Sequence, residues 1–223
     1  MSEPQEAAEE QQAHALVVGA EALGVPLGPP QIQQLLRYAE LLSRWGAVFN
    51  LSAVRRPQDV VGRHLLDSLS AVGPMERWSA GRSLRVLDVG SGAGLPGLVI
   101  AVARPDWQVT TIDAVAKKVA FVRQAAGELK LGNLDARHGR VEAFAAHDAS
   151  FDLIVSRAFS SLSEFVGLSS ALLAPAGAWL AMKGRRPDSE IRELPPGVEV
   201  FHVEQFTLSG DGGARCLVWI RPH

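Results

Sequence analysis

The sequence predicts an α/β fold with a mostly parallel sheet, and three observations lead to this prediction. Between residues 84 and 182, short apolar runs of strand length alternate with stretches of helical periodicity. The first of these runs opens directly into a turn that holds four glycines within eight residues. The last two apolar runs, 198–206 and 215–220, have no helical stretch between them, which indicates an antiparallel pair. A chain of 223 residues with 47% hydrophobic content can bury one such core and carry a short appendage.

The N-terminal part is predicted to precede the sheet as a separate segment. Residues 1–30 hold five of the 24 acids and no Lys or Arg, and residues 1–13 lack an apolar stripe, so we expect a partly disordered acidic segment. Apolar residues at helical spacing predict helices over 31–49 and 57–72, with a turn at 50–52. The expected divisions are an acidic segment (1–30), a helical extension (31–80) and a main domain (81–223).

The main domain is predicted to hold seven strands, with helices on both faces of the sheet. A glycine-rich loop at 209–213 joins the last two strands into a hairpin. The expected strands are 84–89, 108–112, 134–138, 151–155, 177–182, 198–206 and 215–220, and the expected helices are 95–103, 116–130 and 162–173.

The glycine turn indicates a site for an adenosine-bearing cofactor. Asp88, Gly90, Gly92 and Gly94 form a D-x-G-x-G-x-G pattern, which is closer to S-adenosylmethionine sites than to the G-x-G-x-x-G of dinucleotide sites. Asp113 closes the next strand, 23 residues after Gly90, where a carboxylate can accept hydrogen bonds from both ribose hydroxyls. Two plainer interpretations stay open. The glycines could only tighten the turn, and Asp113 could only cap the helix that begins near residue 116.

Composition excludes several classes of protein. The single cysteine, Cys216, excludes an internal disulfide, and no cysteine or histidine cluster has the spacing of a metal site, so we expect no metal. No apolar run approaches about 20 residues and the N-terminus is acidic, so we expect a cytoplasmic protein with no membrane partner. The 193 residues after position 30 hold 22 basic and 19 acidic groups. This excess of positive charge is small compared with that of a domain that binds nucleic acid by itself.

Six basic residues are candidates for contacts with nucleic-acid phosphates. They follow or neighbour strand ends, which places several of them at the edge of the sheet where the glycine turn lies. The candidates are Lys117, Lys118, Arg123, Lys183, Arg185 and Arg186.

From about residue 30 to 221 the chain resembles the bacterial 16S rRNA guanine-N7 methyltransferases, also called the glucose-inhibited division protein B family. The combination of segments is more specific than the glycine turn alone. The segments that carry the resemblance are Asn50-Leu51-Ser52, Arg63-His64-Leu65-Leu66-Asp67-Ser68, Asp88 to Gly97, Arg140-Val141-Glu142, Ser156-Arg157-Ala158-Phe159 and Lys183-Gly184.

The resemblance implies a Rossmann-like class I methyltransferase that uses S-adenosylmethionine. It would methylate N7 of a guanosine in the decoding region of 16S rRNA, and we expect a monomer that acts on a small-subunit particle. The cofactor contacts that carry over are Gly90, Leu95, Val141, Glu142 and Arg157. Many relatives have Phe in place of Leu95 and Asn in place of Gly46, so those two contacts differ here.

Guanine N7 carries a lone pair that can attack without losing a proton, so we expect catalysis by positioning and no general base. Arg157 is the one residue with a possible catalytic role. It would bind the methionine carboxylate, reach an RNA phosphate, or form a salt bridge with Asp152 or Asp88. His64 and Asp67 share one helix face and would either contact substrate or tie that helix to the main domain. A methyltransferase for small molecules or proteins, or an inactive cofactor-binding module, are the alternatives.

Overall fold

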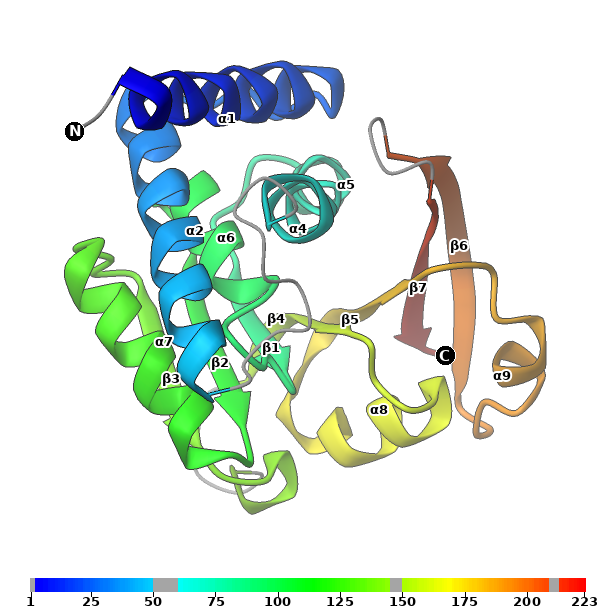
Figure 1. Ribbon diagram of the computed structural model, residues 1–223. Helices are drawn as coiled ribbons and strands as arrows, with labels where there is room; N and C mark the ends of the chain where they lie inside the picture. Colours follow the sequence, from blue (N-terminus) through cyan, green and yellow to red (C-terminus); the bar gives the residue numbers. More distant parts are fainter. Residues whose placement is uncertain (1–2, 50–59, 145–149, 209–212) are drawn as a thin grey trace.

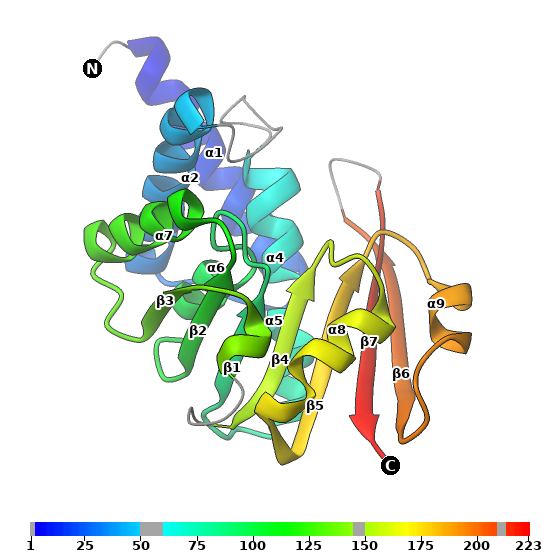
Figure 2. The same ribbon diagram turned by 90° about the horizontal axis from the view of Figure 1, so that it is seen from below.

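The computed structural model describes residues 3–49, 60–144, 150–208 and 213–223. Within them the strands form one seven-stranded sheet of order β3-β2-β1-β4-β5-β7-β6 (Figure 2). The first five strands pair in parallel, and β7 runs antiparallel to β5 and β6. The predicted mixed sheet with its C-terminal hairpin is therefore confirmed. The strands are β1 (Arg85–Val89), β2 (Gln108–Asp113), β3 (Leu134–His138), β4 (Phe151–Arg157), β5 (Leu173–Lys183), β6 (Val198–Thr207) and β7 (Ala214–Pro222).

Helices cover both faces of the sheet, because the strand residues alternate between two apolar surfaces. The helices α6 (Gly97–Ala103) and α7 (Ala116–Glu128) cover one face, and α8 (Leu162–Ser169) covers the other (Figure 1). Val86 belongs to the core on the first face and Leu87 to the core on the second. A short helix, α9 (Asp188–Arg192), lies between β5 and β6. The prediction of a helix over 162–173 is too long, since a 3-10 turn follows α8 and β5 begins at Leu173.

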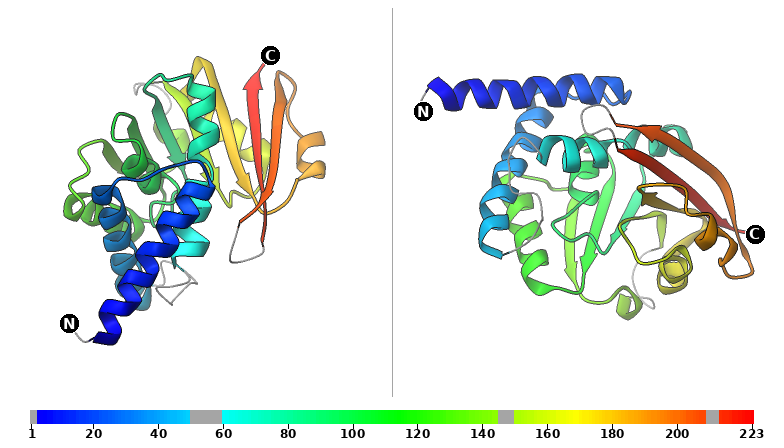
Figure 3. Two further views of the ribbon diagram at one scale, coloured as in Figure 1. Left: turned by 90° about the horizontal axis from the view of Figure 1, so that it is seen from above. Right: turned by 45° about the vertical axis from the view of Figure 1, so that its right-hand side comes forward.

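The acidic N-terminal segment differs from the expected disordered tail. Glu3–Ala22 forms one helix, α1, which lies over the 61–66 segment and over α2 (Pro29–Phe49), outside the layer that covers the sheet (Figure 3). Glu, Gln and Ala are strong helix formers, and Leu16 and Ala20 are fully buried, so the helix has an apolar contact that the sequence pattern did not reveal.

The predicted helical extension shares its core with the main domain. The α2 residue Gln31 donates its side-chain amide to the carbonyls of Val102 and Ala103 at the end of α6, and Gln34 donates to Leu129 at the end of α7. These bonds satisfy carbonyls that a helix end leaves open. They also fix the direction of α2 across the helical layer, which matters for the site described below.

The segment predicted as a single helix over 57–72 is irregular. Positions 50–59, including the expected turn, lie outside the described residues. From there the chain forms a π-helix, η1 (Val61–Leu66), then α4 (Asp67–Leu69), and an unpredicted helix, α5 (Val72–Ser79). A π-helix turn is wider than an α-helix turn and frequently occurs at functional sites. Here it brings Arg63, His64 and Asp67 toward the carboxyl ends of β4 and β5.

Replacement of Gly97 by Ala tests how tightly β1, β2 and α6 meet. A Cβ at this position would lie 2.6 Å from Cγ2 of Thr111 and 2.8 Å from Oδ2 of Asp88. We expect the variant Gly97→Ala to lose about 1–3 kcal/mol of unfolding free energy in urea titrations, because overpacking forces buried atoms apart. Gly127→Ala is the control, since it lies on the exposed side of α7 with open space around its Cβ position and should not destabilise. Equal stability of the two variants would contradict the close packing.

Candidate cofactor and substrate site

The glycine turn after β1 requires residues without side chains. Gly90, Gly92 and Gly94 have φ angles of +70°, +60° and +94°, in the left-handed region that glycine adopts without strain. The backbone amides of Gly90 and Ser91 both donate to the carbonyl of Ile112, at 2.9 and 3.1 Å. The turn is thereby attached to the end of β2, the neighbouring parallel strand.

Asp88 connects the strand before this turn to the helix after it. Its carboxyl group is fully buried, and Oδ2 accepts a 2.7 Å hydrogen bond from the backbone amide of Gly97, the first residue of α6. Oδ1 has no hydrogen-bond partner within the described part of the chain. Burial raises the pKa of Asp88 to about 7, although the Gly97 bond and the charge of Arg157 lower it.

Asp113, at the end of β2, accepts a hydrogen bond from the same turn. Its Oδ2 accepts from the amide of Gly92 at 2.9 Å, and its Oδ1 accepts from the amide of Val115, just before α7, at 2.8 Å. Nζ of Lys118 lies 3.8 Å from Oδ2. Each carboxylate oxygen keeps further acceptor capacity, so this group can brace the turn and still accept a bond from a ribose hydroxyl.

The space beside the turn fits an adenosine-bearing cofactor. A Cβ on Gly92 would meet no atom within 4 Å, and one on Gly90 would lie 3.7 Å from the ring of Phe159. Val141 is buried and Glu142 is exposed in the 3-10 turn that follows β3. The expected contacts therefore come together at the carboxyl ends of β1, β2, β3 and β4, the edge where open α/β sheets bind ligands.

Two side chains next to the turn, those of Leu95 and Tyr38, are buried and support it from the protein core. Leu95 is 5% exposed and belongs to the core, so a cofactor would meet its backbone more than its side chain. Tyr38 of α2 is fully buried and donates its hydroxyl to the carbonyl of Ala93 inside the glycine turn, at 2.7 Å. The apolar stripe of α2 contains this residue, but only the packing of α2 on the turn assigns it a role.

Arg157, at the end of β4, is paired with Asp67. Its Nη1 lies 2.9 Å from Oδ2 of Asp67, while Nε of Arg215, from β7, binds the other carboxylate oxygen. The expected alternatives of a salt bridge with Asp152 or Asp88 are wrong, since Oδ2 of Asp152 accepts from the backbone amide of Arg85 and Oδ2 of Asp88 from that of Gly97. Asp67 thus ties the 61–69 segment to the main domain.

His64 precedes Asp67 by three residues on the π-helical segment, and Cys216 follows Arg215 in β7 with its side chain in the core on the other face of the sheet. Both side chains are uncharged at neutral pH. Burial, together with the charge of Arg157, lowers the pKa of His64 to about 4. Burial raises the pKa of the Cys216 thiol above its ordinary value. A thiol with a raised pKa is a poor nucleophile, because the thiolate is the reactive form.

The six basic candidates do not form one free patch. Lys118 pairs with Asp113, and Nε of Arg123 donates to the carbonyl of Ala136, which ties α7 to β3. Lys183 binds Glu190 at 2.8 Å and the carbonyl of Phe159 at 3.2 Å. The remaining three are exposed, one of them in an ion pair with a neighbour: Lys117, Arg185 and Arg186.

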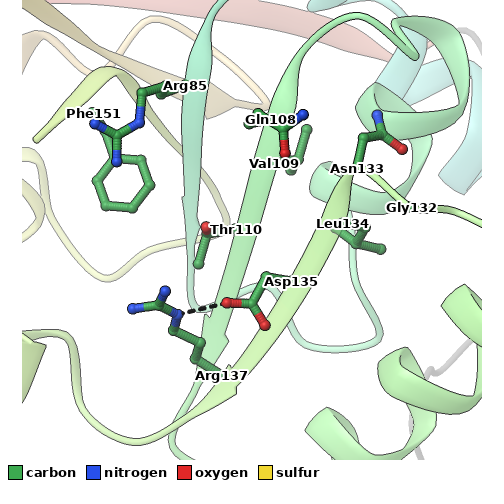
Figure 4. A pocket seen from close by; sticks show the side chains of 10 residues that line it. All are labelled: Arg85, Gln108, Val109, Thr110, Gly132, Asn133, Leu134, Asp135, Arg137 and Phe151. Atoms are coloured by element: carbon green, nitrogen blue, oxygen red, sulfur yellow. Dashed lines mark hydrogen bonds and ion pairs between the residues drawn. The ribbon is translucent and has the colours of Figure 1, made fainter. Parts of the chain in front are cut away.

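A hollow of about 350 Å³ lies at the opposite edge of the sheet (Figure 4). It is lined by the first residues of β1, β2 and β3 together with polar side chains such as Asp135 and Arg137, which pair at 2.7 Å. Because the glycine turn follows the last residue of β1, this hollow is separate from the cofactor edge.

The described residues contain neither a cluster of metal ligands nor a membrane-spanning helix. Within them, no group of three or more His, Cys, Asp or Glu side chains is arranged to hold a metal ion. No helix in the same part of the chain is long and apolar enough to span a membrane.

The fold is that of the class I S-adenosylmethionine-dependent methyltransferases. TrmN from Thermus thermophilus superposes with a TM-score of 0.55 at 21% identity, over 73% of this chain and 53% of that chain. The glycopeptide N-methyltransferase MtfA gives a TM-score of 0.56 at 18% identity, over 68% of this chain and 96% of that chain. At sequence identities of 21% and 18%, this structural similarity is evidence for the fold alone.

Sequence comparison assigns the family. Residues 31–216 match the family described as rRNA small subunit methyltransferase G. The chain is 51% identical over 208 residues to the ribosomal RNA small subunit methyltransferase G of Leptothrix cholodnii, covering 93% of this chain and 94% of that protein. It is 50% identical over 217 residues to the protein of the same name from Acidovorax sp. strain JS42, covering 94% and 95%. The chain therefore belongs to the small-subunit rRNA methyltransferase G family.

Replacement of Tyr38 by Phe tests the support of the glycine turn by α2. The variant leaves the buried Ala93 carbonyl without its hydroxyl donor, so we expect a loss of about 1–2 kcal/mol in unfolding free energy and a several-fold weaker affinity for S-adenosylhomocysteine by calorimetry. Ser43→Ala is a matched control on the same helix, because the buried Ser43 hydroxyl makes no hydrogen bond within the described residues. Unchanged stability and affinity in Tyr38→Phe would argue against this support.

Replacement of Asp88 by Asn tests the raised pKa. The folded pKa of about 7 lies above the ordinary value of 3.8, so the native state binds the proton more tightly and the acid's contribution to stability falls as pH rises from about 4 to about 7. The asparagine side chain keeps an oxygen for the Gly97 amide and carries no charge. We therefore expect the stability of Asp88→Asn relative to wild type to rise by up to about 4 kcal/mol across that window, measured by urea unfolding without cofactor. A pH-independent difference would mean that the carboxyl is ionised throughout.

Proposed function

We propose that this protein transfers a methyl group from S-adenosylmethionine to N7 of a guanosine in the decoding region of 16S rRNA. The observation that carries the proposal is the braced glycine turn of Gly90, Gly92 and Gly94 in a chain that is about half identical to small-subunit rRNA methyltransferases over most of its length. The site residues that bind the cofactor are Asp88, Gly90, Gly92, Gly94, Leu95, Asp113, Val141, Glu142 and Arg157.

The chemistry agrees with the groups at the site. When bound, S-adenosylmethionine supplies an electrophilic methyl group on a sulfonium. The N7 lone pair forms the new bond as the bond from carbon to sulfur breaks, sulfur keeps that electron pair, and the guanine acquires the positive charge. No proton moves, so no general base is needed. This suits a site in which His64, with its pKa lowered to about 4, is a weak base.

Positioning then supplies the rate enhancement. Holding two reactants in line contributes on the order of 7–11 kcal/mol. Asp88 and Asp113 fix the turn through the amides of Gly97 and Gly92, and Arg157 is held by Asp67 at the end of β4. A rigid turn beside a fixed guanidinium is the arrangement that such catalysis requires.

The substrate is rRNA within a small-subunit particle, and the protein binds it as a monomer in the cytoplasm. The excess of 22 basic over 19 acidic groups after residue 30 is small for a protein that binds naked RNA by charge alone. Several of the basic side chains are also engaged within the protein, Lys183 and Arg123 among them. Recognition by the shape of an assembled particle compensates for weak electrostatic attraction.

Incubation with tritiated S-adenosylmethionine tests the substrate. We expect label to appear as 7-methylguanosine at a single site of 16S rRNA in small subunits from cells that lack the enzyme, with lower activity on stripped rRNA. The labelled nucleosides are mapped by nuclease digestion and chromatography. Absence of label in RNA, despite measurable cofactor binding, would favour a small-molecule or protein substrate. Equal activity on both RNA forms would contradict the preference for a particle.

Replacement of Gly92 by Asp tests the cofactor site. The space beside Gly92 is open, so the new carboxylate would occupy the space assigned to the cofactor, close to Asp113, on a backbone with φ of +60°. We expect loss of S-adenosylhomocysteine binding in calorimetry. The matched control is Gly132→Asp, at an exposed turn before β3 where a Cβ also meets no atom. Binding that survives in Gly92→Asp would refute the site.

A further inference from the structure

A second hollow lies at the carboxyl ends of β4 and β5, on the far side of Arg157 from the glycine turn. Its volume is about 360 Å³. It is enclosed by the π-helical segment, the ends of β4 and β5, and the start of β7. Its charged and apolar lining includes Arg63, Asp67, Arg157, Met182, Arg215 and Leu217.

The charged side chains of this hollow favour an anion. Three arginines line it, Arg63, Arg157 and Arg215, while the carboxylate of Asp67 is the only acid among the described residues that line it. His64 also lines it, and burial keeps that ring neutral at pH 7 by lowering its pKa to about 4. The positive excess matches a phosphodiester, since guanidinium groups are suited to bidentate contacts with phosphate oxygens.

The same face of the sheet also carries apolar side chains at this hollow. Met182 and Leu217 line it, and each is 6% exposed or less. Met182 pairs with Arg157 of β4 on one side and with Leu217 of β7 on the other, so these side chains lie next to one another on one face. A flat aromatic base can cover such a surface, and a polarisable thioether such as that of Met182 makes favourable contacts with aromatic rings. An apolar surface beside a guanidinium cluster is complementary to a nucleotide, which has an apolar base face next to a charged backbone.

Two further features show that this is a built site. Asp67 is 8% exposed and binds Arg157 through one oxygen and Arg215 through the other, so guanidinium groups from two strands are held in place. Ala158, which also lines the hollow, has a φ of +61°, a left-handed conformation that costs free energy for a residue with a Cβ. Strained backbone of this kind clusters at ligand sites.

We propose that this hollow is the subsite for the target nucleotide, with Met182 and Leu217 against the base and Arg215 and Arg63 toward the phosphodiester. This inference rests on the proposed function and names the part of the site that receives the substrate. Arg157 stands between the subsite and the cofactor edge, because β4 lies next to β1 in the sheet. The transferred methyl group would therefore have a short path to N7.

A wider hollow continues from this subsite along the surface. It has a volume of about 960 Å³ and is lined by residues 183–190, Arg192 and Ala214. The two hollows share Lys183 and Gly184. Arg185 and Arg192 line this wider hollow, which gives the backbone on one side of the target nucleotide a path past α9.

Replacement of Arg215 by Gln tests the subsite. Asp67 keeps its 2.9 Å bond to Arg157 in this variant, so the fold should persist. We expect KM for small subunits to rise about tenfold or more, as loss of a charged hydrogen bond predicts, while Kd for S-adenosylhomocysteine changes less than twofold. Arg63→Gln, an exposed position, should act in the same direction. Arg221→Gln is the control, because Arg221 lies at the other end of β7 and pairs with Glu199.

A binding measurement separates this inference from the proposed function. Saturation-transfer NMR with 5′-GMP, and with guanosine or inorganic phosphate as separate probes, should give the strongest signal for GMP on wild type and a reduced signal on Arg215→Gln. If wild type methylates no small subunits, the proposed function fails and the GMP signal alone decides the subsite. Wild-type kinetics in both arginine variants, or an altered affinity for S-adenosylhomocysteine with unchanged KM for subunits, would overturn the subsite.

Discussion

The structure of the site depends on one buried contact, between the carboxyl group of Asp88 and the backbone amide of Gly97. It joins the end of β1 to the first residue of α6, at a distance of 2.7 Å and with no exposure of Asp88 to solvent. Thr111 of β2 packs so closely against the same point that only glycine fits at position 97. Because two strands and a helix meet there, the three left-handed glycines between them have little freedom to move.

That fixed turn divides the carboxyl edge of the sheet into two halves with different chemistry. On one side, the end of β2 carries the carboxylate of Asp113, which the amides of Gly92 and Val115 hold in place and which suits a ligand rich in hydroxyl groups. On the other side, β4, β5 and β7 carry guanidinium groups next to the apolar side chains of Met182 and Leu217. The reversal of strand order between β1 and β4 places the boundary at Arg157, as expected for ligand sites in open α/β sheets.

The N-terminal helices take part in the site as well as in the fold. Tyr38 of α2 reaches the glycine turn, and Asp67 of α4 holds both Arg157 and Arg215. Removal of these helices would therefore expose the core of the main domain and release two arginines at the carboxyl edge of the sheet at the same time. The acidic first helix is the exception, since its contacts are with α2 and the 61–66 segment.

Local sequence patterns are enough to predict the order of the strands along the chain, the antiparallel hairpin, and the glycine turn with its flanking acids Asp88 and Asp113. These follow from local patterns, because strand period, turn chemistry and strand-end acids are set by neighbours in the chain. Packing between distant segments sets the helix at Glu3–Ala22, the partners of Tyr38 and Arg157, and the ion pair of Lys183 with Glu190. Each of these depends on a contact between residues or segments that belong to different elements of the fold, and a long charged side chain can reach several partners. Which one it binds is fixed by packing, which no local pattern encodes.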